Sequence, residues 1–213
     1  MSGCRTSESN ATSSERSPSA GATPLPEPQF EGPLSLEQAL LARRSTRAFS
    51  DREVDLEAIA QLLWAAQGVT DPRGFRTAPS AGALYPLELY VVTQAGVFRY
   101  LPEDHALEVI KTGDFRTDLY NVALRQDAVL DAPLVIVVTA VYARTAAKYG
   151  TERSPRYVHL EAGHAAQNVL LQAAALGLGA VPIGAFEDSG VQDVLSLPED
   201  HQPLYLVPVG HPE

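Results

Sequence analysis

The chain has 213 residues, of which 45% are hydrophobic and 20% are charged, so it can bury the core of one large domain or two small ones. Its formal net charge of −10 and isoelectric point near 4.9 argue against an electrostatic nucleic-acid binder, which usually presents a basic face. A single cysteine, Cys4, excludes an intrachain disulfide, and no apolar run resembles a signal peptide or reaches the ~18 residues of a membrane span, so we expect a soluble, cytoplasmic protein.

The first 33 residues differ in composition from the rest of the chain. They are rich in Ser, Thr, Pro, Glu and Gly, and they lack apolar periodicity. Such a segment buries too little surface to offset the entropy lost on ordering it. We therefore expect a disordered N-terminal tail over residues 1–33 and one folded domain over residues 34–213.

The folded part alternates between helical and strand-like patterns. Apolar residues at three- and four-residue spacing predict helices, two of which begin at the N-caps Ser35 and Asp55. Runs of β-branched and aromatic residues predict strands, and the Val/Ile run 134–140 is typical of a central strand buried on both faces. In chain order we expect helices at 35–44 and 55–68, a loop at 70–83, strands at 87–93 and 97–101, a weakly helical stretch at 117–129, a strand at 134–140, an unassigned segment at 143–154, a helix at 155–176, a strand at 180–183, a helix at 191–195 and a strand at 204–209.

These elements do not follow a strict strand–helix–strand repeat. The order favours an α+β domain in which helices flank a mixed or mostly antiparallel sheet, rather than a doubly wound fold. The longest helix, 155–176, is rich in small apolar residues that allow another backbone to approach closely. We expect it to be a buried central helix and a candidate for a subunit contact.

Three guanidinium groups fall within Arg43-Arg44-Ser45-Thr46-Arg47, at the exit of the first helix of an acidic chain. Guanidinium forks and a hydroxyl suit a phosphate, because they donate several hydrogen bonds to its oxygens. The alternative is that these cations favour the negative end of the helix dipole and are simply solvated. The cluster alone does not decide between the two.

Common catalytic and nucleotide-binding motifs are missing. His159 and His164 are five residues apart and do not have the spacing of a zinc-protease helix, so we expect no metal site. There is no G-x-S-x-G elbow for a serine hydrolase, and neither a G-x-G-x-x-G fingerprint nor a P-loop. The usual nucleotide-binding folds are therefore excluded, but the arginine cluster, whose chemistry suits a phosphate, still has to be explained.

Two further stretches are built from small residues. The first, 77–86, reads Thr-Ala-Pro-Ser-Ala-Gly-Ala-Leu-Tyr-Pro and leads into a strand, so its backbone can lie flat against a planar ligand. The second, 177–186, ends a strand with Pro-Ile-Gly and exposes backbone amides. Each is also readable as an ordinary tight turn.

Together, the three stretches resemble the nitroreductase superfamily of FMN-binding proteins, over residues 34–210. Arg43, Ser45 and Arg47 match the family's R-x-S-x-[RK] motif. The resemblance implies that this motif holds the FMN phosphate and the pyrimidine side of the ring, and that a later backbone amide faces flavin N5. The implied ring contacts are Pro79, Ser80, Ala81, Gly82, Ala83, Pro182, Ile183, Gly184 and Ala185.

One branch of the superfamily matches better than ordinary nitroreductases. The run Ser-Ala-Gly-Ala-Leu-Tyr-Pro at 80–86 looks like the SagB-type branch, which includes azoline dehydrogenases of thiazole- and oxazole-modified peptide biosynthesis. That branch carries a Lys-Tyr pair associated with proton handling, and Lys148-Tyr149 stands in the matching place. The alternative for this pair is an exposed loop with no chemical role.

The C-terminus departs from the family pattern. Relatives often place a basic residue after the final Val-Gly, whereas Gly210 is followed here by His211-Pro212-Glu213. Either His211 substitutes for that residue or Arg43 and Arg47 hold the phosphate alone. The resemblance also implies a homodimer with FMN at its interface, and the short C-terminus leaves a swapped C-terminal arm in doubt.

Three functions remain open from the sequence. The first is an FMN-dependent oxidoreductase of SagB type, in which hydride passes through flavin N5 and an azoline-containing peptide is the substrate. The second is an NAD(P)H-dependent reductase of nitroaromatics or quinones, with the nicotinamide stacking directly on the flavin. The third is a non-catalytic flavin-binding scaffold subunit of a peptide-modifying complex.

Overall fold

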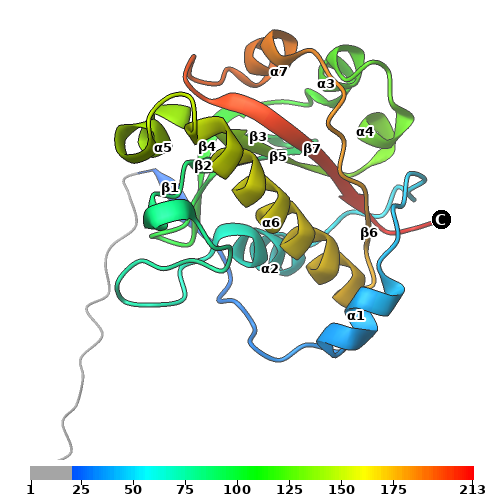
Figure 1. Ribbon diagram of the computed structural model, residues 1–213. Helices are drawn as coiled ribbons and strands as arrows, with labels where there is room; N and C mark the ends of the chain where they lie inside the picture. The colour runs from blue at the N-terminus through cyan, green and yellow to red at the C-terminus, as the bar shows by residue number, and fades with distance from the viewer. Residues whose placement is uncertain (1–20) are drawn as a thin grey trace, which may run out of the picture.

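The computed structural model describes residues 21–213, and a seven-stranded sheet lies at its centre (Figure 1). The spatial order of the strands is β1-β4-β3-β2-β5-β7-β6, and every neighbouring pair is antiparallel. The strands are β1 Ala22–Pro24, β2 Leu87–Thr93, β3 Gly96–Leu101, β4 Ala106–Thr112, β5 Leu134–Ala140, β6 Gly179–Ala180 and β7 Gln202–Gly210.

Helices cover both faces of this sheet. On one face α2 and the long α6 pack together over alternate residues of β2 and β5, whereas α3, α4 and α7 cover the opposite face. The helices are α1 Leu36–Ala42, α2 Leu56–Gln67, α3 Arg116–Val122, α4 Asp127–Asp131, α5 Tyr142–Tyr149, α6 Ser154–Ala175 and α7 Asp188–Leu195, with a short 3-10 helix η1 at Ala81–Ala83. The expected α+β class is therefore confirmed, and the sheet is antiparallel throughout.

Strand β5 has the burial that its sequence predicts. Leu134, Ile136 and Val138 point into the layer under α2 and α6, and Val135 and Val137 into the opposite layer. All five are fully buried, because side chains alternate across a strand and both faces of this one are covered.

The expected helix caps are also present. The Ser35 hydroxyl accepts a hydrogen bond from the Gln38 N–H, and the Gln38 side chain accepts one from the Ser35 N–H, which forms a capping box for α1. The Asp55 carboxylate accepts from the Ala58 N–H at the start of α2. Helix α6 is central as expected. It contacts helices α1, α2 and α5 and strands β2, β5, β6 and β7.

The expected boundary of the N-terminal tail is wrong. Residues 22–24 form β1 and pair with β4, and Leu25 is buried in the core under α2. The composition of this stretch predicts disorder. It is ordered because its backbone pairs with β4 at the sheet edge and because the apolar Leu25 side chain is buried. Residues 1–20 of the expected tail lie outside the described residues.

Three other elements differ from expectation. Strand β4 and helix α5 were not expected, since Leu-Glu-Val-Ile-Lys-Thr lacks strict alternation and α5 is a polar helix of eight residues. The helical stretch 117–129 divides into α3 and α4, because Leu124 and Arg125 adopt left-handed backbone angles between them. No helix of residues 21–213 is long and apolar enough to cross a bilayer.

Candidate functional site

The arginine stretch lies at the β6 edge of the sheet. Ser45 forms a parallel bridge with Ala180, and the Thr46 N–H donates to the Ala180 carbonyl at 3.1 Å. Thr46 packs so tightly against Gly179 that a Cβ there would lie 2.6 Å from its side chain, so only glycine fits. The arginine stretch and the small-residue stretch 177–186, far apart in sequence, are thus brought together.

The guanidinium groups of the cluster differ in their contacts. Arg44 turns back on the end of α1 and donates to the carbonyls of Leu41 and Arg43 at 2.9 and 2.8 Å, which agrees with the solvated alternative for this residue. The side chains of Arg43 and Arg47 make neither a hydrogen bond nor an ion pair to any residue of the described chain. Two uncompensated guanidiniums in an acidic protein suit an anionic ligand.

The C-terminal segment reaches the same edge through its backbone. Ser50 N–H donates to the His211 carbonyl at 2.9 Å, and Phe49 bridges Pro212. The His211 side chain, however, borders a cavity of about 330 Å³ that is lined by Arg52 and the start of α2 and includes neither Arg43 nor Arg47. A phosphate contact by His211 therefore stays a prediction.

The Pro-Ile-Gly stretch leaves the sheet at Gly184. Ile183 exchanges two backbone hydrogen bonds with Leu206, at 2.8 and 3.0 Å, and the chain then turns away. The exposed Gly184 and Ala185 N–H groups donate to no other residue of the structure between 21 and 213. A free backbone donor at a strand end can hydrogen-bond a ring nitrogen without any special side chain.

The small-residue loop around η1 is held in a strained form. Gly82, Ala83 and Tyr85 have φ angles of 66°, 54° and 44°, in the left-handed region that disfavours side chains. The Ser80 hydroxyl accepts a hydrogen bond from the Tyr85 N–H at 2.9 Å and closes the loop. Backbone strain of this kind persists where surrounding contacts over-determine it, often at a ligand site.

The predicted Lys148–Tyr149 pair sits directly on this loop, at the end of α5. A Cβ built on Gly82 would lie 2.9 Å from Lys148 Nζ and 3.0 Å from Tyr149 Oη, so both polar ends occupy the space that glycine leaves. The Tyr149 ring packs against Tyr157 of α6, with centroids 4.7 Å apart. The pair is thus part of an ordered helix end beside the loop rather than an isolated surface pair.

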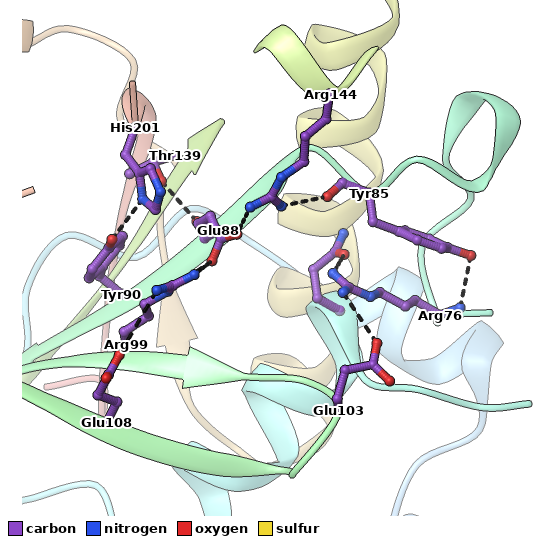
Figure 2. Close-up of polar contacts among 11 residues, drawn as sticks. Arg76, Tyr85, Glu88, Tyr90, Arg99, Glu103, Glu108, Thr139, Arg144 and His201 are labelled. Carbon is purple, nitrogen blue, oxygen red and sulfur yellow. Dashed lines mark hydrogen bonds and ion pairs between the residues drawn. The ribbon is translucent and has the colours of Figure 1, made fainter. Parts of the chain in front are cut away.

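Figure 2 shows a polar network that reaches the loop at Tyr85 and that the sequence did not single out. Glu88 of β2 is 8% exposed, and its two oxygens accept from Arg144 of α5 and from Arg99 of β3. Arg144 also donates to the Tyr85 carbonyl at 3.0 Å. The available signal was a lone glutamate in the otherwise apolar strand 87–93.

A second buried carboxylate, Glu161 of α6, was also missed. It is 2% exposed, and its Oε1 has no hydrogen-bond partner among the described residues. Burial raises the pKa of this carboxyl from its ordinary 4.5 to about 7, against the opposing influence of the Ser80 hydroxyl, the Arg76 charge and the Gln67 amide. Glu161 thus lies behind the same loop, and its charge changes near neutral pH.

The histidines singled out in the sequence lie elsewhere. His159 Nε2 is 2.6 Å from Tyr142 Oη, and His164 is exposed on α6. Within residues 21–213, no group of three or more His, Cys, Asp or Glu side chains is arranged to hold a metal ion.

Comparison with known proteins identifies the fold. The chain is 44% identical over 183 residues to the protein MJ1384 of Methanocaldococcus jannaschii, named as a nitroreductase, and the match covers 83% of this chain and 91% of that protein. A crystal structure of a protein described as a nitroreductase from Ralstonia eutropha matches with a TM-score of 0.81 and 32% identity, over 91% of this chain and 90% of that one.

A more distant relative is the microcin B17-processing protein McbC of Escherichia coli. It is 29% identical over 162 residues, which cover 70% of this chain and 59% of that protein. The model of the Nitroreductase family itself matches residues 40–211, from the arginine stretch to the C-terminal segment. The chain belongs to the nitroreductase family, whose members are typically flavin-binding oxidoreductases.

Proposed function

We propose that the protein is an FMN-dependent oxidoreductase of SagB type that oxidises an azoline ring in a peptide to the azole. The observation that carries the proposal is the seating of Lys148 and Tyr149 against Gly82, within the loop expected to line the flavin. A lysine amine and a phenol at the edge of a flavin site are suited to proton transfer.

The described residues fit FMN. Arg43 and Arg47 offer unpaired guanidiniums for its phosphate, and Ser45 lies between them. The strained loop offers a flat backbone surface, and Gly184 offers a free N–H for a ring nitrogen. When bound, FMN supplies a two-electron acceptor that takes a hydride from the substrate. The ring contacts proposed are Pro79, Ser80, Ala81, Gly82, Ala83, Pro182, Ile183, Gly184 and Ala185.

Lys148 has the role of proton acceptor in this proposal. Aromatisation of an azoline removes one hydride and one proton from neighbouring ring atoms, and the Lys148 side-chain nitrogen is the group placed to take the proton. The Tyr149 hydroxyl, beside the same glycine, orients the ring or passes the proton onward. The relationship to McbC supports a peptide substrate.

A second candidate is an NAD(P)H-dependent nitro or quinone reductase. The nitroreductase names of the relatives from M. jannaschii and R. eutropha, which resemble this chain more than McbC does, favour it. In that case the nicotinamide is the hydride donor, and Lys148 and Tyr149 contact the acceptor. The third candidate is a non-catalytic flavin-binding scaffold, and no contact among the described residues specifically favours it.

We also propose a cytoplasmic homodimer with FMN at its interface. Leu36, Leu40 and Leu41 of α1 are more than half exposed, as is Leu160 of α6. A Cβ on Gly163 of α6 would meet no atom within 4 Å, so the outer side of α6 is open to a second backbone. An exposed apolar surface of this kind is typical of a subunit contact.

The first experiment is an absorbance spectrum of the purified protein, followed by anaerobic addition of NADH, NADPH or an azoline-containing peptide. We expect a yellow protein that the peptide bleaches and that converts the azoline to an azole. Bleaching by a nicotinamide alone supports the reductase, and flavin that no donor reduces supports the scaffold. A colourless protein that takes up no FMN contradicts all three.

A further inference from the structure

We propose that Arg144 is a positioning residue that holds the Lys148–Tyr149 end of α5 against the loop around η1. The inference rests on the proposed function for its chemical meaning, since it concerns how the proton-transfer pair is held. Whether Arg144 holds Lys148 in place can be tested separately from the proposed reaction.

Arg144 lies one turn before Lys148 on α5, and its guanidinium divides between two acceptors. One nitrogen donates to the carbonyl of Tyr85, at the strained end of the loop, at 3.0 Å, and the other pairs with Glu88 (Figure 2). The loop therefore touches α5 at two points, Gly82 against Lys148 and Tyr149, and Tyr85 against Arg144.

The partner of Arg144 is itself fixed in the sheet. Glu88 is buried on β2, its carbonyl accepts from the Thr139 hydroxyl at 3.2 Å, and its second carboxylate oxygen is held by Arg99 at 2.8 Å. Arg99 also reaches Glu108 at 3.9 Å. A buried carboxylate between two guanidiniums is a rigid anchor, and a planar guanidinium is the side chain that can bond it and a carbonyl at once.

The C-terminal end of α5 packs on α6 through the Tyr149 and Tyr157 rings, but it has few polar contacts of its own. The helix is eight residues long, its N-cap makes no side-chain hydrogen bond, and it ends at Gly150 with φ of 78°. Lys148 is exposed, and its ammonium forms no hydrogen bond or ion pair with the residues described. Among the residues that the structure describes, Arg144 is therefore the side chain of α5 that hydrogen-bonds both the loop, at Tyr85, and the sheet, at Glu88.

The chain offers a direct probe, because Lys148 and Lys111 are its only lysines. Reductive ¹³C-methylation of the FMN-loaded protein gives one NMR signal for each, with the N-terminal amine resolved by its shift. Lys111 serves as an internal reference, since its ammonium donates to the Val194 carbonyl at 2.8 Å, away from the loop. The variants compared are Arg144→Met, Arg144→Gln as a milder change, and Arg99→Met as a matched control that removes the other arm on Glu88.

We expect Arg144→Met to move the Lys148 signal toward that of a free lysine side chain and to narrow it, with Arg144→Gln in between. The Lys111 signal stays in place in both, and Arg99→Met leaves the Lys148 signal unchanged. In azoline oxidation, Arg144→Met lowers kcat about tenfold or more with little change in KM, because the proton acceptor is misplaced rather than the substrate lost.

An unmoved Lys148 signal in folded Arg144→Met, or an equal shift in Arg99→Met, overturns the proposal. If Arg144→Met does not fold, the position of the Lys148 signal is measured in Arg144→Gln instead, and the same outcomes apply. If the wild-type protein oxidises no azoline, the proposed function fails, but the NMR comparison still decides whether Arg144 places Lys148.

Discussion

Replacing Glu161 by glutamine should change how the stability of the protein depends on pH. The carboxyl is 2% exposed, and its pKa is raised from 4.5 to about 7 chiefly by burial. Each pKa unit corresponds to about 1.4 kcal/mol, so ionising Glu161 inside the fold costs up to about 3 kcal/mol relative to the unfolded chain.

The direction of the effect follows from proton binding. Between pH 4.5 and about 7 the folded state holds the Glu161 proton more tightly than the unfolded state does. The stabilising contribution is therefore complete below pH 4.5, falls as the pH rises through this interval, and is lost above about pH 7. A glutamine has nearly the same volume and carries no charge. The Glu161→Gln variant should therefore not lose this stability as the pH rises.

The assay is urea denaturation of both proteins, with matched flavin content, at about one unit above and two units below the raised pKa. At the lower pH the two free energies of unfolding should agree within about 1 kcal/mol, and at the higher pH the variant should be more stable by up to about 3 kcal/mol. Other groups, such as buried His201, titrate equally in both proteins and cancel in the difference. Glu31→Gln, at an exposed position, is the control. A difference that is the same at both pH values would refute the assigned cost of ionising Glu161.

Three further changes test the proposed site. Arg47→Ala should weaken FMN binding about tenfold or more through loss of a charge-assisted contact, measured by fluorescence titration, whereas Arg44→Ala should not, because Arg44 bonds its own helix end. Gly82→Ala should cost about 1 kcal/mol of backbone strain in urea denaturation and also lower turnover by displacing Lys148, whereas Gly150→Ala, with a similar φ and open space, should cost only stability. Lys148→Ala should keep its FMN spectrum but lose azoline oxidation, and full turnover in it would remove the proton-transfer role.

Much of the fold was accessible from local pattern. The caps Ser35 and Asp55 and the Val/Ile run of β5 gave elements whose bounds agree with the structure within a few residues. What could not be predicted depends on tertiary contact. Strand β1 exists because the edge of β4 accepts it, and α5 is held by Glu88 and α6 rather than by its own propensity.

The candidate site divides in the same way. The three small-residue and arginine stretches and the Lys-Tyr pair were found in the sequence, because backbone shape and charge leave a local signature. The positions of these stretches relative to one another could not be predicted. No local pattern indicates that Ser45 lies beside Ala180 or that Lys148 lies against Gly82. Those contacts join residues more than 60 positions apart and arise only from the closure of the sheet.

The two missed carboxylates nevertheless had a common signal. Glu88 interrupts an apolar strand buried on both faces, and Glu161 falls on the same helical stripe as the buried Val158 and Ala165. A carboxylate in a position that periodicity assigns to the core must be paired, or it must become neutral, because an isolated buried charge is too costly. Glu88 takes the first course, with two arginines, and Glu161 takes the second, with a raised pKa. Glu88 is joined to the loop around η1 through Arg144 and the Tyr85 carbonyl, and Glu161 lies beside Ser80, so each out-of-register acid is connected to the candidate site.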